Sequence, residues 1–249
     1  MTVVFVHGNP ETSAIWGPLV TELRRNDPGD IVLLSPPGFG APLADDFGAT
    51  HTEYRDWLAA ELEKFDTPVD LVGHDWGGGH VVSVAMNRPE LLHSWVSDVV
   101  GVFDEDYVWH DMAQVWQTPG AGEEAVDALM GMPPADRTAL LAALGMPEDV
   151  TADVGAAFGP QMGRAILALY RSASRPAELG AELERAAERP GLSVMATADT
   201  FVGTEEQRRR AARRAGARVE VLDGLGHWWM LQDPKGAAEF LTRFWGSLD

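Results

Sequence analysis

Short apolar runs alternate with helix-length stretches along most of this chain, and that rhythm limits the folds open to it. The runs are apolar or β-branched at consecutive positions, which is typical of strands covered on both faces. They occupy residues 3–6, 31–34, 69–72, 95–102, 192–195 and 219–222. Strand alternating with helix predicts a parallel sheet, because parallel neighbours need a long crossover connection. We therefore expect an α/β fold with a mostly parallel sheet of about six strands and helices on both faces.

The rhythm breaks between the fourth and fifth runs. Residues 103–190 show helical patterns with no convincing strand between them, and Pro and Gly at 119–120 and 133–134 would divide them into short helices. A chain of 249 residues in this fold class need not be split into independent domains. We therefore expect a core domain made of residues 1–102 and 191–249, interrupted by a helical cap subdomain at 103–190.

The charge of the chain narrows the class of partner. A formal net charge of -19 means that most of the surface would repel nucleic acid or an anionic membrane. The arginines at 208–214 follow Glu205 and Glu206 in a helical pattern, which favours a solvated helix face over an anion site. We expect a small, neutral, largely apolar substrate, with no nucleic-acid or membrane partner. The sequence leaves open whether the protein forms a homodimer.

The residue types exclude several kinds of chemistry. The chain has no cysteine, so disulfides, thiolate catalysis and cysteine-ligated metals are excluded. The first residues lack a signal-peptide pattern and no apolar run approaches the length of a membrane span, which predicts a cytoplasmic protein. We expect no metal and no other cofactor, because five histidines lack metal-ligand spacing and fit structural or surface roles: His51, His74, His80, His93 and His110.

The segment 69–78 predicts a strand, a tight turn and the start of a helix. Small residues stand two before and two after Asp75, which is the spacing of a nucleophile elbow with aspartate in place of serine. The flanking glycines permit the strained turn that pushes the central side chain into a cleft. The alternative is an ordinary glycine-rich loop in which Asp75 caps the helix. We take Asp75 as the candidate nucleophile.

A histidine and an acid follow in the order that such an elbow requires. His227 comes directly after the last predicted strand, where this kind of fold supplies its general base, and Asp199 comes just after the strand before it. A carboxylate at Asp199 could orient the imidazole and stabilise its cationic form. The rival acid is Asp98, in the strand that follows the elbow helix. We favour Asp199.

The end of the first predicted strand offers an oxyanion hole. A His7-Gly8 turn there can aim the backbone N–H of Asn9 at the same point as the N–H of Trp76. His7 would then hold the turn rather than act as an acid or base. The alternative is a plain strand-to-loop corner with no role in binding.

Four motifs spread over the chain resemble those of the epoxide hydrolase and haloalkane dehalogenase branch of the α/β-hydrolases. They are HGNP at 7–10, SPPGFG at 35–40, GHDWGG at 73–78 and GHW at 226–228. The resemblance implies an α/β-hydrolase fold with an inserted helical cap, although the cap itself is only loosely similar. The first strand of this sequence corresponds to what would be the third strand of most relatives, so we expect their antiparallel N-terminal hairpin to be absent.

A carboxylate nucleophile narrows the reaction. Attack by Asp75 on an ester carbonyl would give an anhydride with little gain, whereas displacement at saturated carbon gives an alkyl ester. Water activated by His227 would then attack the carboxyl carbon of Asp75. Asp199 would hold the imidazole, while the N–H groups of Asn9 and Trp76 stabilise the oxyanion. The residue type therefore points to epoxides or alkyl halides.

The leaving group separates these two substrate classes. An epoxide yields an alkoxide that needs a proton, and Tyr170-Arg171 resembles the pair that carries one donor tyrosine in epoxide hydrolases. Val115 stands where the second tyrosine is expected, and Tyr107 is the candidate substitute. The alternative for both tyrosines is a structural role.

A halide needs N–H donors instead, and Asn9 with Trp76 resembles the halide-binding pair of haloalkane dehalogenases. Epoxide hydrolases often carry this tryptophan too, and the acid at Asp199 is closer to their pattern. We therefore expect an epoxide to be opened to a diol, with dehalogenation as one alternative and an inactive binding protein as another. Candidate residues for a largely apolar substrate pocket are His7, Phe103, Trp109, Trp116 and Trp229.

Overall fold

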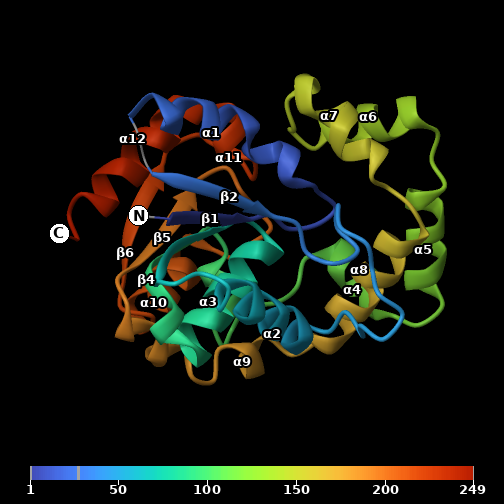
Figure 1. Cartoon of the computed structure of the whole chain (residues 1–249). Helices are drawn as coiled ribbons and strands as arrows, with labels where there is room; N and C mark the ends of the chain where they lie inside the picture. The colour runs from blue at the N-terminus through green and yellow to red at the C-terminus, as the bar shows by residue number, and fades with distance from the viewer. Residues whose placement is uncertain (1, 27–28, 249) are drawn as a thin grey trace.

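Six parallel strands form one sheet at the centre of the computed structural model, which describes residues 2–26 and 29–248 (Figure 1). In chain order the strands are β1 (Thr2–Val6), β2 (Asp30–Leu34), β3 (Val69–Gly73), β4 (Leu92–Ser97), β5 (Gly191–Ala196) and β6 (Ala217–Leu222). Their order across the sheet is β2-β1-β3-β4-β5-β6, and each neighbouring pair is parallel. The predicted parallel sheet of about six strands is confirmed.

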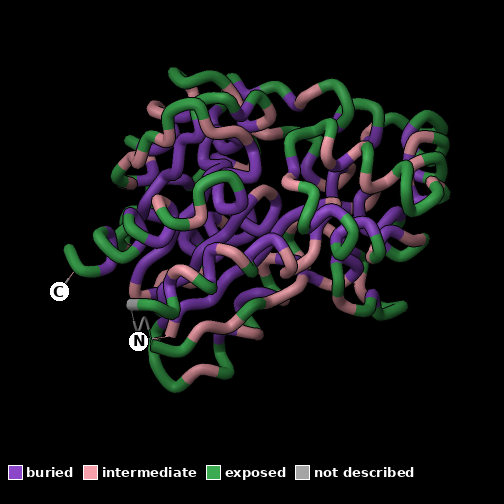
Figure 2. The backbone as a smooth tube through the Cα atoms, turned by 90° about the horizontal axis from the view of Figure 1, so that it is seen from above, coloured by how far each residue is buried: buried purple, intermediate pink, exposed green. Residues whose placement is uncertain are grey.

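Burial follows the sequence pattern strand by strand. Every residue of β3 and β5 is buried, whereas the edge strands β2 and β6 are partly exposed. Figure 2 shows buried segments running through the middle of the molecule with exposed segments around them. Consecutive apolar residues are needed in the inner strands because helices cover both faces of the sheet.

The strand predicted over residues 95–102 is wrong at both ends. β4 begins at Leu92 and ends at Ser97, and the chain then forms a 3₁₀ turn at Val100–Phe103. The hydroxyl of Ser97 accepts the N–H of Val99 at 3.2 Å, and such a local side-chain bond competes with continued strand pairing. The apolar run therefore continues past the point where the strand stops.

Helices cover both faces of the sheet (Figure 1). On one face α1 (Gly17–Leu23) packs against α12 (Pro234–Trp245). On the other face lie α2 (His51–Leu62), α3 (Trp76–Asn87) and α10 (Glu205–Arg214), with α2 packed against α3. Among the described residues, no helix combines the length and apolar character needed to cross a membrane.

A helical region is inserted between β4 and β5. Its helices are α4 (Asp111–Gln117), α5 (Ala121–Met130), α6 (Pro134–Ala143), α7 (Glu148–Ala156), α8 (Pro160–Ser172) and α9 (Pro176–Leu179). Helices α4–α8 lie beyond the C-terminal ends of the strands, at the right of Figure 1. Ligands of open parallel sheets bind at that end, so the candidate site lies between the core and this insert. The domain boundaries at 103 and 190 stay predictions.

Candidate active site

Asp75 stands in a strained turn between β3 and α3. Its backbone dihedrals are φ 50° and ψ -130°, a region that residues other than glycine rarely adopt. The turn is held by the N–H of Asp75, which donates to Oδ1 of Asp98 at 3.0 Å. It also passes close to β1, since a Cβ on Gly77 would lie 2.2 Å from the carbonyl oxygen of Val6. Glycine at 77 is therefore required for this turn.

The turn after β1 faces the carboxylate of Asp75. The backbone N–H of Asn9 donates to Oδ1 of Asp75 at 2.9 Å, and the side-chain amide of Asn9 lies 3.5 Å from the same oxygen. A Cβ on Gly8 would stand 2.1 Å from this oxygen, so only glycine allows the approach. This places Asn9 where an oxyanion-hole donor must lie. Trp76 begins α3 immediately after the turn.

His227 lies between the other oxygen of Asp75 and Asp199. Its Nε2 is 3.7 Å from Oδ2 of Asp75, and its Nδ1 is 2.9 Å from Oδ2 of Asp199. Asp98 makes different contacts, because its Oδ2 bonds Nδ1 of His74 and accepts the indole N–H of Trp229 at 2.7 Å. Of the two acids weighed for this role, Asp199 is therefore the one that contacts His227.

The charges of these three side chains depend on one another. Burial raises the pKa of Asp75 to about 6. Burial alone would raise the pKa of Asp199 and lower that of His227, but their ion pair reverses both effects: it holds the pKa of Asp199 near 2 and raises that of His227. At neutral pH both aspartates are thus largely ionised. The negative charge of Asp75 also raises the pKa of His227, so losing that charge in an ester would favour the neutral, basic imidazole.

A cavity of about 30 Å³ lies next to Asp75, between the core and the insert. Six of the residues singled out in the sequence line it: Asp75, Trp76, Phe103, Tyr107, Trp109 and Tyr170. The other lining residues were not assigned to the site, and they include His51, His80, His110 and Phe201. A volume of this size holds on the order of two water molecules. Side chains of the insert must therefore move before a substrate can enter.

Three predicted pocket residues are placed behind the lining. His7 bonds the carbonyl oxygen of Gly8 at 2.9 Å and the hydroxyl of Ser35 at 3.0 Å, and burial lowers its pKa to about 4. Trp116 packs against Tyr170 with ring centroids 4.8 Å apart. Trp229 is buried beneath the turn, where it donates to Asp98. These three side chains support the turn after β1, the ring of Tyr170 and Asp98 rather than bordering the cavity themselves.

The two insert tyrosines differ in what their hydroxyl groups contact. Tyr107 donates to the carbonyl oxygen of Phe201 at 2.7 Å, so its proton is already engaged. Burial raises the pKa of Tyr170 well above its usual value, although hydrogen bonding from the side chains of Trp76 and Asn9 opposes the shift. Tyr170 therefore lines the cavity with a hydroxyl that stays protonated.

Comparisons with known proteins show the family of the chain. Residues 3–240 match the profile of the family described as "Alpha/beta hydrolase family". The chain belongs to that family. This confirms the predicted membership, and haloalkane dehalogenases, from the branch that the motifs resemble, are among its neighbours in sequence and in structure.

Individual relatives of this α/β-hydrolase are distant. A haloalkane dehalogenase of Mesorhizobium japonicum is 29% identical over 136 residues, which cover 50% of this chain and 42% of that enzyme. The chain thus matches less than half the length of this curated relative. Haloalkane dehalogenase DbeA from Bradyrhizobium elkani has a TM-score of 0.71 at 20% identity, with 99% of this chain and 91% of that chain covered. A serine hydrolase of carbazole degradation, CarC, has a TM-score of 0.73 at 18% identity, with 99% and 91% covered.

The fold therefore does not select the nucleophile, because structures named for dehalogenases and for a serine hydrolase match it about equally well. What distinguishes this α/β-hydrolase is the residue at the elbow and its contacts. The chemistry must be argued from those side chains.

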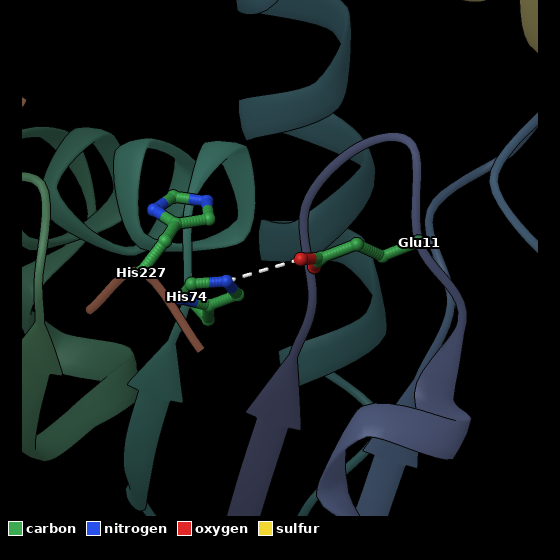
Figure 3. Close-up of side chains that lie close together, drawn as sticks. All are labelled: Glu11, His74 and His227. Atoms are coloured by element: carbon green, nitrogen blue, oxygen red, sulfur yellow. Dashed lines mark hydrogen bonds and ion pairs between the residues drawn. The ribbon is translucent and has the colours of Figure 1, made fainter. Parts of the chain in front are cut away.

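A buried ion-pair network beneath the elbow was missed in the sequence (Figure 3). Glu11 is fully buried, and its Oε1 lies 3.1 Å from Nε2 of His74, whose other nitrogen bonds Asp98. Glu11 also accepts the N–H of Gly8 at 3.1 Å and the indole N–H of Trp228. The network therefore joins the turn after β1, the elbow and the loop that carries His227.

Three of these side chains also have the spacing of metal ligands. Glu11, His74 and His227 each offer one atom, and these atoms lie within 4.8 Å of one another (Figure 3). Burial alone would lower the pKa of His74, but the carboxylates of Glu11 and Asp98 raise it well above its usual value. A protonated imidazole has no lone pair for a metal. The contacts thus favour a network held by protons over a metal site.

Proposed function

We propose that this α/β-hydrolase forms an alkyl ester on Asp75, hydrolyses that ester with water, and in this way opens a small, largely apolar epoxide to a diol. One observation carries the proposal. The carboxylate of Asp75 lies between the N–H of Asn9 at 2.9 Å and Nε2 of His227 at 3.7 Å, with Asp199 behind the imidazole. This arrangement supplies a nucleophile, an oxyanion donor and an oriented base.

The two oxygens of Asp75 suit different parts of the reaction. Oδ1 accepts the N–H of Asn9, whereas Oδ2 lies on the side of His227. In the first step, Oδ2 attacks the epoxide carbon, the carbon–oxygen bond of the ring breaks, and the electron pair passes to the ring oxygen. Oδ1 then becomes the carbonyl oxygen of the ester and already has its hydrogen-bond donor.

His227 serves the second step. The imidazole takes a proton from water, and the water oxygen attacks the carboxyl carbon of Asp75. The charge that develops on Oδ1 is stabilised by the N–H of Asn9. When the intermediate collapses, the carbon–oxygen bond to the substrate breaks, and the leaving oxygen takes the proton held by His227, which releases the diol. Asp199, 2.9 Å from Nδ1, stabilises the imidazolium that forms.

Tyr170 supports an epoxide as the substrate. Tyr170 lines the cavity beside Asp75 and Trp76, and burial keeps its hydroxyl protonated by raising its pKa well above the usual value. A departing alkoxide needs such a proton, whereas a departing halide does not.

Dehalogenation is the second candidate, and a specific observation favours it. The side chains of Asn9 and Trp76 both lie at the nucleophile, and a relative of the chain carries the name haloalkane dehalogenase. A departing halide would accept hydrogen bonds from these two N–H groups.

Matched substrates separate the two candidates. Terminal epoxides and 1-bromoalkanes of equal chain length are incubated with the enzyme, and diol and bromide are measured. We expect diol formation to exceed bromide release by at least about a hundredfold in turnover, and Tyr170→Phe to slow only the epoxide reaction by about that factor. Bromide release that exceeds diol formation would establish the second candidate instead. The Asp75→Ala variant is the control for turnover without the nucleophile.

A further inference from the structure

We propose that His110 is a second hydrogen-bond donor to the reacting oxygen of the substrate, next to Tyr170 in the cavity. The inference rests on the proposed opening of an epoxide at Asp75 and names a residue for which the sequence indicated only a structural or surface role. His110 immediately precedes α4 and lines the cavity beside Asp75. Its imidazole lies 6.2 Å from the ring of Tyr170 and 5.3 Å from that of Phe201, measured between centroids.

One hydrogen bond fixes where the proton of His110 lies. The N–H of Ala113 donates to Nδ1 of His110 at 3.3 Å, so Nδ1 carries a lone pair. The proton of the neutral ring is then on Nε2, the nitrogen further from the backbone. Burial and the charge of nearby His227 lower the pKa of His110, which keeps this tautomer uncharged at neutral pH.

The N–H of His110 is available to a ligand. Within residues 2–26 and 29–248, no hydrogen bond is found for Nε2, while the hydroxyl of Tyr107, the donor expected from the sequence, is bound to Phe201. His110 is half-buried, so this N–H can bond a substrate oxygen that enters the cavity.

The reaction requires a donor on the side of the cavity opposite Asp75, and His110 comes from the part of the chain that faces the core there. An in-line displacement puts the leaving oxygen on the side of the attacked carbon away from Asp75. Asp75 comes from the core, whereas His110 and Tyr170 both come from the region inserted between β4 and β5. His80, another lining histidine, is on α3, the helix that begins at the nucleophile, and its ring stacks on Tyr54.

Tyr170 and His110 have different roles in the first step because only one of them gives up its proton. When the ring bond breaks, the new alkoxide takes the proton of Tyr170, and His110 keeps its own proton and donates only a hydrogen bond. Hydrolysis of the ester releases one proton from water, which returns to Tyr170. The sum of the two steps is epoxide plus water giving diol, with both side chains restored.

His110 also bonds the first turn of α4, so the test must separate that role from donation to the substrate. Three variants do so. Phenylalanine removes both the N–H and the helix cap, asparagine keeps a good cap but has a shorter side chain, and glutamine keeps a long side chain with an N–H donor. Each is compared with wild type in single-turnover alkylation by a terminal epoxide and by a 1-bromoalkane, and in thermal unfolding.

We expect His110→Phe and His110→Asn to slow alkylation by the epoxide by about tenfold to a hundredfold. Alkylation by the bromoalkane should change by less than about threefold, because no alkoxide forms. His110→Gln should recover most of the epoxide rate, and His110→Asn should recover thermal stability without recovering that rate.

Two results would overturn the inference. One is a wild-type epoxide rate in His110→Phe; the other is His110→Asn recovering the epoxide rate together with stability, which would assign His110 to helix capping alone. Failure of the proposed function looks different, because the wild-type enzyme itself would then not open any epoxide. In that case His110 would have no alkoxide to bind and the inference would fall with it.

Discussion

At the scale of single residues, burial of Asp75 sets the chemistry available to the elbow. The side chain is 15% exposed, and burial raises its pKa to about 6. A carboxylate held in a poorly solvated site is a better nucleophile than one in water, because fewer solvent hydrogen bonds must be broken when it attacks. The cost is that Asp75 becomes protonated at a higher pH than an exposed aspartate.

The raised pKa of Asp75 predicts how alkylation depends on pH. Only the ionised carboxylate attacks, so the single-turnover alkylation rate should be level above pH 6 and fall about tenfold per unit well below it. Hydrolysis needs neutral His227, and Asp199, which keeps its charge in the ester, still raises the pKa of that imidazole, so hydrolysis should also weaken on acidification. Both steps are followed by rapid quench and mass spectrometry of the intact protein. An alkylation rate that stays level down to pH 4 would contradict the assignment of Asp75.

At the scale of structural elements, the buried network of Glu11, His74 and Asp98 holds the pieces of the site in register. Asp98 accepts the N–H of Asp75, and Glu11 accepts the N–H of Gly8, the residue before Asn9. The protonated imidazole of His74 lies between the two carboxylates and offsets part of their charge. The nucleophile and its oxyanion donor are thus fixed by one set of contacts.

Neutralising Glu11 should destabilise the fold. Burial alone would raise its pKa, but the charge of His74 lowers it from 4.5 to about 2. The stabilisation is therefore fully present above pH 4.5 and is lost as pH falls toward 2. We expect Glu11→Gln to lose about 3 kcal/mol of unfolding free energy at pH 7, measured by urea unfolding, and the difference from wild type to shrink on acidification.

Glu220→Gln is the matched control for this variant. Glu220 pairs with Arg243 at 2.7 Å, but the side chain of Arg243 is 62% exposed, so its removal should change stability far less. A Glu11→Gln protein as stable as Glu220→Gln would show that the buried network does not stabilise the fold.

The elements differ in how far the sequence predicts them. The inner strands and the helical insert were predictable, because consecutive apolar residues and proline breaks are local signals. The end of β4 was not, since the apolar run continues past Ser97, whose hydroxyl accepts the N–H of Val99. Glu11 was missed because its burial depends on partners 63 and 217 positions away, and an acidic side chain without a known partner is normally taken as exposed.

The site shows the same division. Asp75, Asn9 and His227 belong to motifs with fixed spacing, and Asp199 follows a predicted strand; the four lie together. The contacts of Tyr107 and His110 could not be predicted, because loop 104–110 and the insert carry no motif that fixes which side chain faces the cavity. That depends on packing against Tyr170 and Phe201.

At the scale of the whole molecule, the proposed reaction is divided between two parts of the chain. The C-terminal edge of the sheet supplies the nucleophile, the base and the oxyanion donor, while the insert supplies Tyr170 and His110. The cavity between them is only about 30 Å³, so binding requires the two parts to separate locally and closure would exclude solvent from the ester. The net charge of -19 suits a neutral substrate that approaches from water.

The central claim is that Asp75 forms a covalent ester, and a single turnover in heavy-oxygen water tests it most directly. Enzyme in excess over epoxide is quenched after one turnover, and the peptide that contains Asp75 is analysed by mass spectrometry together with the diol. We expect the heavy oxygen in the carboxylate of Asp75 and not in the diol, because water attacks the carboxyl carbon. Heavy oxygen in the diol alone would mean that water attacks the substrate directly and would contradict the account.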